Sequence, residues 1–286
     1  GLTSVGILCP HAKYNASLLR PMPLTGKVAF ISQSRSLCEA ILDHARRERV
    51  GFSHFVCVGS MLDVDIGDLI NYFGSDPAVR SILFYVERLT RVRKFISASR
   101  AVARTKPIVA LKPCRDRQGA PMGASVTASD ALRTEDAVYD AIFERAGIVR
   151  VNTIQELFDC SRFLAGKPLP KRRGLAIIAN AGAPAAMAVS ALGAYGIEPA
   201  PLRPETAQAL DELLPASWNR TNPIHVFREA SPERYCRVVQ TCSRAKEISE
   251  LLIIHVPSAY ETGSAVAASL ERILKDTPFP VVAVWM

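Results

Sequence analysis

Short apolar runs alternate with amphipathic segments along almost the whole chain, and this alternation constrains the fold more than any other feature. Residues 27–32 (KVAFIS) form an uninterrupted apolar run, which is typical of a strand buried on both faces of a parallel sheet. Residues 37–49 follow with apolar side chains at helical spacing, and Gly51 ends that segment. Such alternation predicts right-handed crossovers and parallel sheets with helices on both faces.

The same patterns predict the remaining elements. The predicted strands are 27–32, 52–58, 81–86, 107–112, 148–151, 175–179, 198–202, 251–256 and 280–285, with an extended piece opening at 222–223. The predicted helices are 37–49, 63–73, 91–104, 130–146, 154–164, 183–195, 205–214, 232–245 and 265–275. Residues 113–129 have no clear periodicity and are expected to form a functional loop. Residues 167–173 (KPLPKRR) are the predicted linker, because two prolines oppose a helix there. We therefore predict two consecutive doubly wound α/β domains.

Composition narrows the classes of function. With 49% hydrophobic and 22% charged residues, the chain is expected to be folded rather than intrinsically disordered, and its apolar runs are too interrupted to span a membrane. The net charge of +8 is spread over short basic runs and aromatic residues make up only 7%, so we expect no nucleic-acid partner. A phosphate-rich ligand such as coenzyme A or a nucleotide remains compatible with this surplus.

The cysteines and histidines argue against disulfides and metals. Seven cysteines, an odd number without a CxxC pair, are typical of a reducing compartment, and we expect a cytoplasmic protein. The five histidines show no ligand spacing, so no metal site is expected. The chain begins with Gly1 and has no secretory signal pattern, which suggests a fragment of a longer protein.

Two turns are candidate anion sites, because each follows the first strand of a predicted domain and opens a helix. The first contains Ser32, Gln33 and Ser34, and the second contains Asn180 and Gly182. Neither turn matches the dinucleotide or Walker fingerprints. The alternative for both turns is an ordinary helix cap, in which Ser or Asn satisfies the first amides of the helix.

Several motifs, taken in order, resemble the NDP-forming acyl-CoA synthetases. They are TGKVAFISQS, GFSHFVCVGSMLDVD, ILFYVE, KPIVALK, DAVYDAIFERAGIVRV, LAIIANAGAP and TNP. The resemblance implies two succinyl-CoA-synthetase-like, flavodoxin-like domains at 25–166 and 174–286, joined by the linker 167–173. It also implies that residues 1–24 are the exit segment from a CoA-binding Rossmann domain, and that ATP-grasp domains would follow the last residue.

The resemblance also implies a phosphoryl-carrying histidine in a motif SHTG. Counting back without a gap from Asp136 places Ala128 at that position, between Thr127 and Ser129. An alanine methyl cannot accept a phosphoryl group, so we expect no catalytic residue in this chain. Glu87 matches the family carboxylate that orients the histidine. Together with Ser32, Gln33, Ser34, Thr127, Ser129, Asn180 and Gly182, it is expected to be vestigial or ligand-binding.

Loss of this histidine makes the chain similar to the synthetase-like region of bacterial lysine acetyltransferases that carry a GNAT domain. The first hypothesis is therefore a non-catalytic module that binds or senses acyl-CoA and regulates a GNAT domain outside this chain. It would need no cofactor of its own, and acetyl-CoA or CoA would reach it through neighbouring domains. Its partners would be protein substrates of the GNAT domain and further copies of itself. One alternative is a divergent acid–CoA ligase that uses ATP or ADP, and another is a non-catalytic assembly module.

Overall fold

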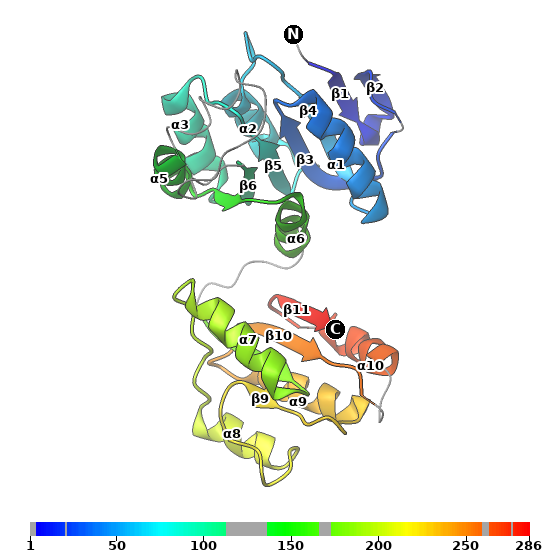
Figure 1. Cartoon of the computed structure of the whole chain (residues 1–286), viewed down its shortest axis with the longest axis vertical. Coiled ribbons are helices and arrows are strands. Elements are labelled where there is room, and N and C mark those ends of the chain that lie inside the picture. Colours follow the sequence, from blue (N-terminus) through cyan, green and yellow to red (C-terminus); the bar gives the residue numbers. More distant parts are fainter. Residues whose placement is uncertain (1–3, 21, 113–135, 166–172, 259–262, 276) are drawn as a thin grey trace, which may run out of the picture. The chain divides into compact units, whose positions relative to one another are not determined.

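The computed structural model describes residues 4–20, 22–112, 136–165, 173–258, 263–275 and 277–286. The chain divides into two compact units, Gly1–Ala165 and Gly166–Met286, and each contains one sheet with its own helices (Figure 1). We call them unit 1 and unit 2.

Unit 1 is built on a seven-stranded sheet with the order β2-β1-β4-β3-β5-β6-β7. Its strands are β1 (Gly6–Cys9), β2 (Tyr14–Ser17), β3 (Thr25–Ser32), β4 (Phe52–Cys57), β5 (Ser81–Tyr85), β6 (Ile108–Leu111) and β7 (Val149–Val151). Strands β3 to β7 are parallel, and their order is that of a flavodoxin-like sheet. The predicted flavodoxin-like α/β fold is therefore confirmed.

Helices cover both faces of this sheet. They are α1 (Arg35–Arg47), α2 (Ile66–Ser75), α3 (Val92–Val102), α5 (Asp136–Ala146) and α6 (Ile154–Ala165). Because successive strand residues point to opposite faces, Phe30 packs into one buried cluster with α1 and α6, whereas Ile31 packs into another with α2, α3 and α5. Burial on both faces explains why the strands are uninterrupted apolar runs in the sequence.

The first residues of the chain complete the sheet. Strands β1 and β2 form an antiparallel hairpin around a short 3₁₀ helix, η1 (Pro10–Ala12), and β1 pairs antiparallel with β4. The sequence analysis placed no strand before residue 27, because GILC and YNAS are too short to show a periodicity.

Unit 2 contains a parallel four-stranded sheet with the order β11-β10-β8-β9. Its strands are β8 (Leu175–Ala179), β9 (Ile224–His225), β10 (Glu250–His255) and β11 (Val281–Trp285), and its helices are α7 (Gly182–Gly193), α8 (Pro204–Asp211), α9 (Pro232–Arg244) and α10 (Gly263–Leu274). Helices α8, α9 and α10 bury one face of the sheet, and α7 packs on the other.

One predicted strand of unit 2 is wrong. Residues 198–202 form no strand, because Pro199 and Pro201 have no amide hydrogen with which to donate to a neighbouring strand. Ala200 alone reaches the sheet, where its amide donates to the Leu175 carbonyl at 2.8 Å. Of the helix predicted at 130–146, residues 136–146 form α5 and the earlier ones lie outside the described residues. The loop predicted at 113–129 also lies outside them.

Candidate functional site

The candidate site of unit 1 lies at the carboxyl ends of β3 and β5. In a flavodoxin-like order these two strands flank the switch point, where chain connections leave in opposite directions and open a crevice. Ser32 is the last residue of β3 and pairs with Tyr85 at the end of β5. The turn after β3 and the turn after β5 therefore meet at one edge, which we call the ligand edge of unit 1.

Gln33 ties these two turns together. Its side-chain carbonyl accepts hydrogen bonds from the backbone amides of Glu87 and Arg88, and its side-chain amide donates to the Arg88 carbonyl at 2.9 Å. A single side chain therefore satisfies three backbone groups of the second turn. Gln33 holds the crevice walls in place, and its own polar atoms are already occupied.

The two serines of the first turn also have internal partners. The Ser32 hydroxyl is fully buried, donates to the Ser34 carbonyl at 2.9 Å and accepts from the Ser34 amide at 3.0 Å. The Ser34 hydroxyl accepts from the Leu37 amide and caps α1. The capping alternative is thus confirmed for Ser34. The turn still opens a helix, so the positive end of α1 faces the ligand edge.

The buried side chain of Lys112 supports the turn after β5. This residue is not among the candidate site residues predicted from the sequence. It follows β6 and is only 1% exposed. Its ammonium group donates to the Glu87 carbonyl at 2.9 Å and lies 4.3 Å from the centre of the Tyr139 ring. The Tyr139 hydroxyl accepts from the Leu89 amide at 3.2 Å. A lysine at the end of an apolar strand was the available signal in the sequence.

Arg150 anchors the start of α5 beside this lysine. Its side chain is 4% exposed and pairs with the carboxylates of Asp136 and Asp140, the latter at 2.8 Å. It also donates to the Lys112 carbonyl at 3.1 Å. The ion pairs tie β7 to the first turns of α5.

The turn after β5 is therefore pinned by side chains from three other segments, whereas the Glu87 side chain is exposed. Its carboxylate stands on a fixed backbone and is accessible at the ligand edge. Thr127, Ala128 and Ser129 lie outside the described residues, so their position relative to Glu87 stays a prediction.

A cysteine pair adjoins the same edge. Cys57 ends β4, directly beside Ser32 in the sheet, and Cys38 lies on the first turns of α1. A hydrogen bond from the Cys38 thiol, aided by the amides of Val5 and Gly59, lowers the pKa of Cys57 to about 6, although burial opposes this shift. That hydrogen bond and burial raise the pKa of Cys38.

Unit 2 repeats the arrangement at its own switch point between β8 and β10. Asn180 follows β8 and is 2% exposed. Its side-chain amide donates to the Val256 carbonyl and its side-chain carbonyl accepts from the Val256 amide, both at 2.8 Å. Asn180 thus has the same position and the same two-way bonding as Gln33. The structure places it in a structural bridge.

Gly182 begins α7, and a Cβ built on it would meet no atom within 4 Å. Packing therefore does not require glycine at this position. Ala181 is the residue before the helix, and among the described residues no side chain caps α7. The amides of Gly182 and Ala183 are consequently available to an anion, in contrast to α1 with its Ser34 cap, whereas Pro184 has no amide hydrogen.

Asn222 stabilises the edge of β8 in place of a neighbouring strand. Its side chain accepts from the Ile177 amide and donates to the carbonyls of Leu175 and Ala200, each at 2.9 Å. The Asn222 side chain therefore holds the chain on either side of β8 in place.

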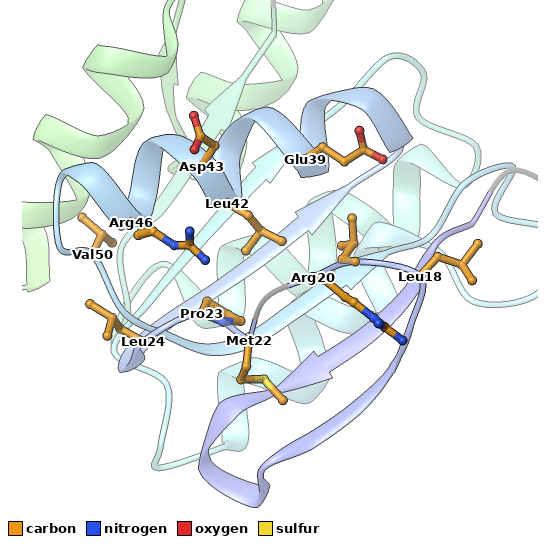
Figure 2. Close-up of a pocket in the computed structure, with 11 residues that line it drawn as sticks. Leu18, Arg20, Met22, Pro23, Leu24, Glu39, Leu42, Asp43, Arg46 and Val50 are labelled. Carbon is orange, nitrogen blue, oxygen red and sulfur yellow. The ribbon is translucent and has the colours of Figure 1, made fainter.

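A separate hollow of about 490 Å³ lies along α1 and the segment that leads into β3 (Figure 2). Glu39, Asp43 and Arg46 line it from α1, opposite Arg20 and Met22. None of its lining residues belongs to the turns after β3 or β5, so it is distinct from the ligand edge.

Most of the chain is similar to known proteins. Residues 25–164 match the succinyl-CoA ligase like flavodoxin domain. The chain is 34% identical over 259 residues to an ADP-forming acetate–CoA ligase I of Archaeoglobus fulgidus, covering 91% of this chain and 37% of that protein. It is 32% identical to the alpha subunit of the ADP-forming acetate–CoA ligase II of Pyrococcus furiosus, covering 100% of this chain and 63% of that subunit.

A solved structure agrees with these relatives. The acetyl-coenzyme A synthetase 1 of Candidatus Korarchaeum cryptofilum, in complex with phosphate and ADP, superposes with a TM-score of 0.90 at 26% identity, over 98% of this chain and 61% of that one. The chain spans between about a third and two thirds of the length of these proteins. They support the ligase alternative more strongly than the acetyltransferase hypothesis.

The described helices include none with the length and apolar character needed to cross a membrane.

Proposed function

We propose that the chain, whose residues 25–164 match the succinyl-CoA ligase like flavodoxin domain, is the ligand-facing pair of domains of an NDP-forming acyl-CoA synthetase. Such a protein joins a carboxylic acid to CoA with ATP as the energy source. The observation that carries the proposal is the ligand edge of unit 1, where Gln33, Lys112 and Tyr139 hold the turn that presents Glu87. The similarity of the chain to ADP-forming acetate–CoA ligases supports the proposal.

The names of the relatives give acetate, CoA, ADP and phosphate as their ligands. For this chain we propose an acyl phosphate or CoA thioester, with ADP or ATP bound mainly outside it. The uncapped amides of α7 suit an anionic group such as phosphate. The positive end of α1 at the edge of unit 1 suits the same chemistry.

We further propose that this site has kept its scaffold and lost its phosphoryl acceptor. The histidines of unit 1 are His11, His44 and His54. His11 follows β1, whose carboxyl end lies at the opposite edge of the sheet because β1 runs antiparallel to β4. His44 lies in the last turn of α1 and His54 within β4, so neither reaches the ligand edge. Ala128 stands where the family resemblance implies the acceptor.

Two assays on the full-length protein test the proposal. Formation of acyl-CoA from an acid, CoA and ATP would support the ligase class and would require an acceptor other than position 128. Incubation with phosphoryl-labelled acetyl phosphate is expected to leave these domains unlabelled. A stable phosphoprotein labelled within residues 1–286 would contradict the loss of the acceptor.

A second candidate is the regulatory module of a GNAT-type lysine acetyltransferase, which Ala128 specifically favours because such a module needs no phosphoryl carrier. Under this candidate, the full-length protein transfers acetyl groups from acetyl-CoA to protein lysines and makes no acyl-CoA from free acid. The same pair of assays therefore separates the two candidates.

A further inference from the structure

Two buried cysteines of unit 1 face each other between the sheet and α1. Cys57 is the last residue of β4, and Cys38 lies in the first turns of α1. Because successive strand residues point to opposite faces, Cys57 shares the face of Phe55, whereas Val56 belongs to the cluster on the other face. Cys38 packs into the same cluster as Cys57, so both sulfurs lie in the layer between β4 and α1.

The two thiols are in direct contact. A hydrogen bond joins Cys38 to Cys57, and the two residues are 0% and 2% exposed. Both are reduced in this structure. Thiols that already point toward each other meet the main geometric requirement for a disulfide, because little of the backbone has to move when the bond closes.

The hydrogen bond between the thiols gives them different roles. It lowers the pKa of Cys57 and, together with burial, raises the pKa of Cys38. Since the thiolate is the form of cysteine that reacts with peroxides, Cys57 is the thiol that is oxidised first. Cys38 is held beside it as the second thiol.

Cys160 and Cys242 provide the contrast. Burial raises the pKa of both thiols, nearby carboxylates add to the effect, and a second cysteine contributes to neither shift. These thiols are therefore typical buried cysteines, which react slowly.

The pair is also joined to the ligand edge of unit 1. Cys57 pairs with Ser32 in the sheet, and a hydrogen bond links the Ser32 side chain to Cys38. The Ser32 hydroxyl in turn bonds to the backbone of Ser34, the residue that caps α1. A bond between the two sulfurs therefore acts directly on the residues that shape the turn after β3.

From this arrangement we propose that Cys38 and Cys57 form a redox modification site, at which hydrogen peroxide converts the two thiols to a disulfide between α1 and the end of β4. The site goes beyond the proposed function and does not depend on it.

The reaction takes place in two steps. The Cys57 sulfur attacks one peroxide oxygen, the oxygen–oxygen bond breaks, and Cys57 sulfenic acid and water are formed. The Cys38 sulfur then attacks the sulfenic sulfur, and the hydroxyl group leaves with the Cys38 proton as a second water. The two sulfurs together lose two electrons to the peroxide, and a dithiol reductant reverses the change.

The test treats the whole folded chain with hydrogen peroxide, blocks the remaining thiols with an alkylating reagent and maps the tryptic peptides by mass spectrometry. Arg47 and Arg49 lie between the two cysteines, so digestion places Cys38 and Cys57 in separate peptides. The linked Cys38–Cys57 peptide is expected to exceed every other cysteine pair at least about tenfold and to disappear with dithiothreitol. Absence of this peptide, or the same distribution of pairs from a chain oxidised in urea, would overturn the inference.

Substitutions separate the two roles. Cys38→Ser removes the second thiol and is expected to raise trapping of Cys57 sulfenic acid by dimedone at least about tenfold over the unchanged chain. Cys57→Ser is expected to abolish the disulfide and to leave Cys38 unmodified. Dimedone on Cys38 in Cys57→Ser, without dimedone on Cys57 in Cys38→Ser, would contradict the assigned order of oxidation.

Cys160→Ser is the matched control in the same unit and is expected to leave the Cys38–Cys57 disulfide unchanged. Loss of the disulfide in this control would overturn the inference, because a third thiol would then be needed. Circular dichroism verifies that each variant is folded before treatment. The peptide map of the unchanged chain needs no substitution, so it decides the matter even where a variant fails to fold.

Discussion

Gln33 follows β3 and hydrogen-bonds to the backbone just after β5. Asn180 follows β8 and hydrogen-bonds to the backbone just after β10. A side-chain amide suits this role because it donates and accepts at once, as a peptide group does. The two residues therefore close the switch points and hold the crevice walls at which ligands approach. In unit 1 this bonding fixes the backbone of Glu87.

Gln33→Ala is expected to lower the free energy of unfolding of unit 1 by about 1 to 3 kcal/mol, because several backbone groups lose their partner. Chemical denaturation followed by far-ultraviolet circular dichroism measures the change. Gln155→Ala is the matched control, since Gln155 is exposed and bonds only Asp159 on the same helix. A loss no larger than that of the control would show that the bridge is not needed for stability.

His255 makes unit 2 sensitive to acid. Its side chain is 1% exposed, and burial holds its pKa below the ordinary value of 6.5. The unfolded chain therefore binds a proton at a pH at which the folded unit does not, so the stability of unit 2 falls as the pH drops below about 6.5. Burial raises the pKa of the neighbouring Tyr235, which stays neutral in this range.

His255→Gln is expected to flatten the pH dependence of urea unfolding between about pH 7.5 and pH 5.5, because the variant removes the titrating group. Tryptophan fluorescence reports unit 2 alone, since Trp218 and Trp285 are the tryptophans of the chain. His54→Gln, in unit 1, serves as the control and is expected to leave this signal unchanged. An unaltered pH dependence in His255→Gln would assign the effect to another group.

The residues of the site were only partly predictable. Gln33, Ser34 and Asn180 could be found because they sit in turns between a strand and a helix. Lys112, Tyr139 and Arg150 could not, because their importance arises where β6, α5 and β7 meet the turn after β5. The position of Lys112 at the end of an apolar strand is a signal in the sequence, but contacts between segments so far apart in the chain leave no local pattern that identifies its partners.

At the scale of elements, helix starts show how local chemistry refines a periodic pattern. The pattern predicted a helix from residue 63, but α2 begins at Ile66 because Asp65 and Asp68 form a capping box. Each carboxylate accepts from the backbone amide of the other residue. Apolar spacing locates the body of a helix, whereas the cap determines its first residue.

Asp65→Ala is expected to destabilise unit 1 by about 1 to 2 kcal/mol, because α2 loses the cap of its first amides. Lys94 and Arg91 also lose a partner, since both lie within 4 Å of the Asp65 carboxylate, at 3.5 and 3.7 Å. Denaturation followed by circular dichroism checks the value. Asp63→Ala is the control at an exposed position two residues earlier, and equal effects of the two substitutions would argue against the capping box.

At the scale of the whole molecule, the strand–helix alternation was sufficient to predict two doubly wound α/β domains, since few topologies satisfy short right-handed crossovers. Their flavodoxin-like type was implied by the family resemblance. The hairpin of β1 and β2 escaped prediction because edge strands of four residues carry little pattern. The buried clusters of Phe30 and Ile31 draw only on unit 1, and those of Ile177 and Ile178 draw only on unit 2. Each unit therefore has its own core.

Phe30→Ala is expected to destabilise unit 1 by about 3 to 5 kcal/mol, because it empties a fully buried position. The denaturant midpoint of the tryptophan fluorescence transition, which reports unit 2, is expected to equal that of the unchanged protein. Denaturation followed in parallel by circular dichroism and fluorescence measures both. A common shift of the two signals would show that the units unfold as one.

The central claim is that the ligand edge is intact and lacks only its phosphoryl acceptor. The most direct measurement compares the unchanged chain with an Ala128→His/Asp130→Gly double variant, which restores the histidine and the glycine that the resemblance implies in the SHTG motif. Each protein is incubated with phosphoryl-labelled acetyl phosphate. The account predicts label on the double variant alone, through transfer of the phosphoryl group from acetate oxygen to an imidazole nitrogen with release of acetate. Label on the unchanged chain would reveal an acceptor elsewhere, and absence of label from both proteins would show that the edge no longer supports the chemistry.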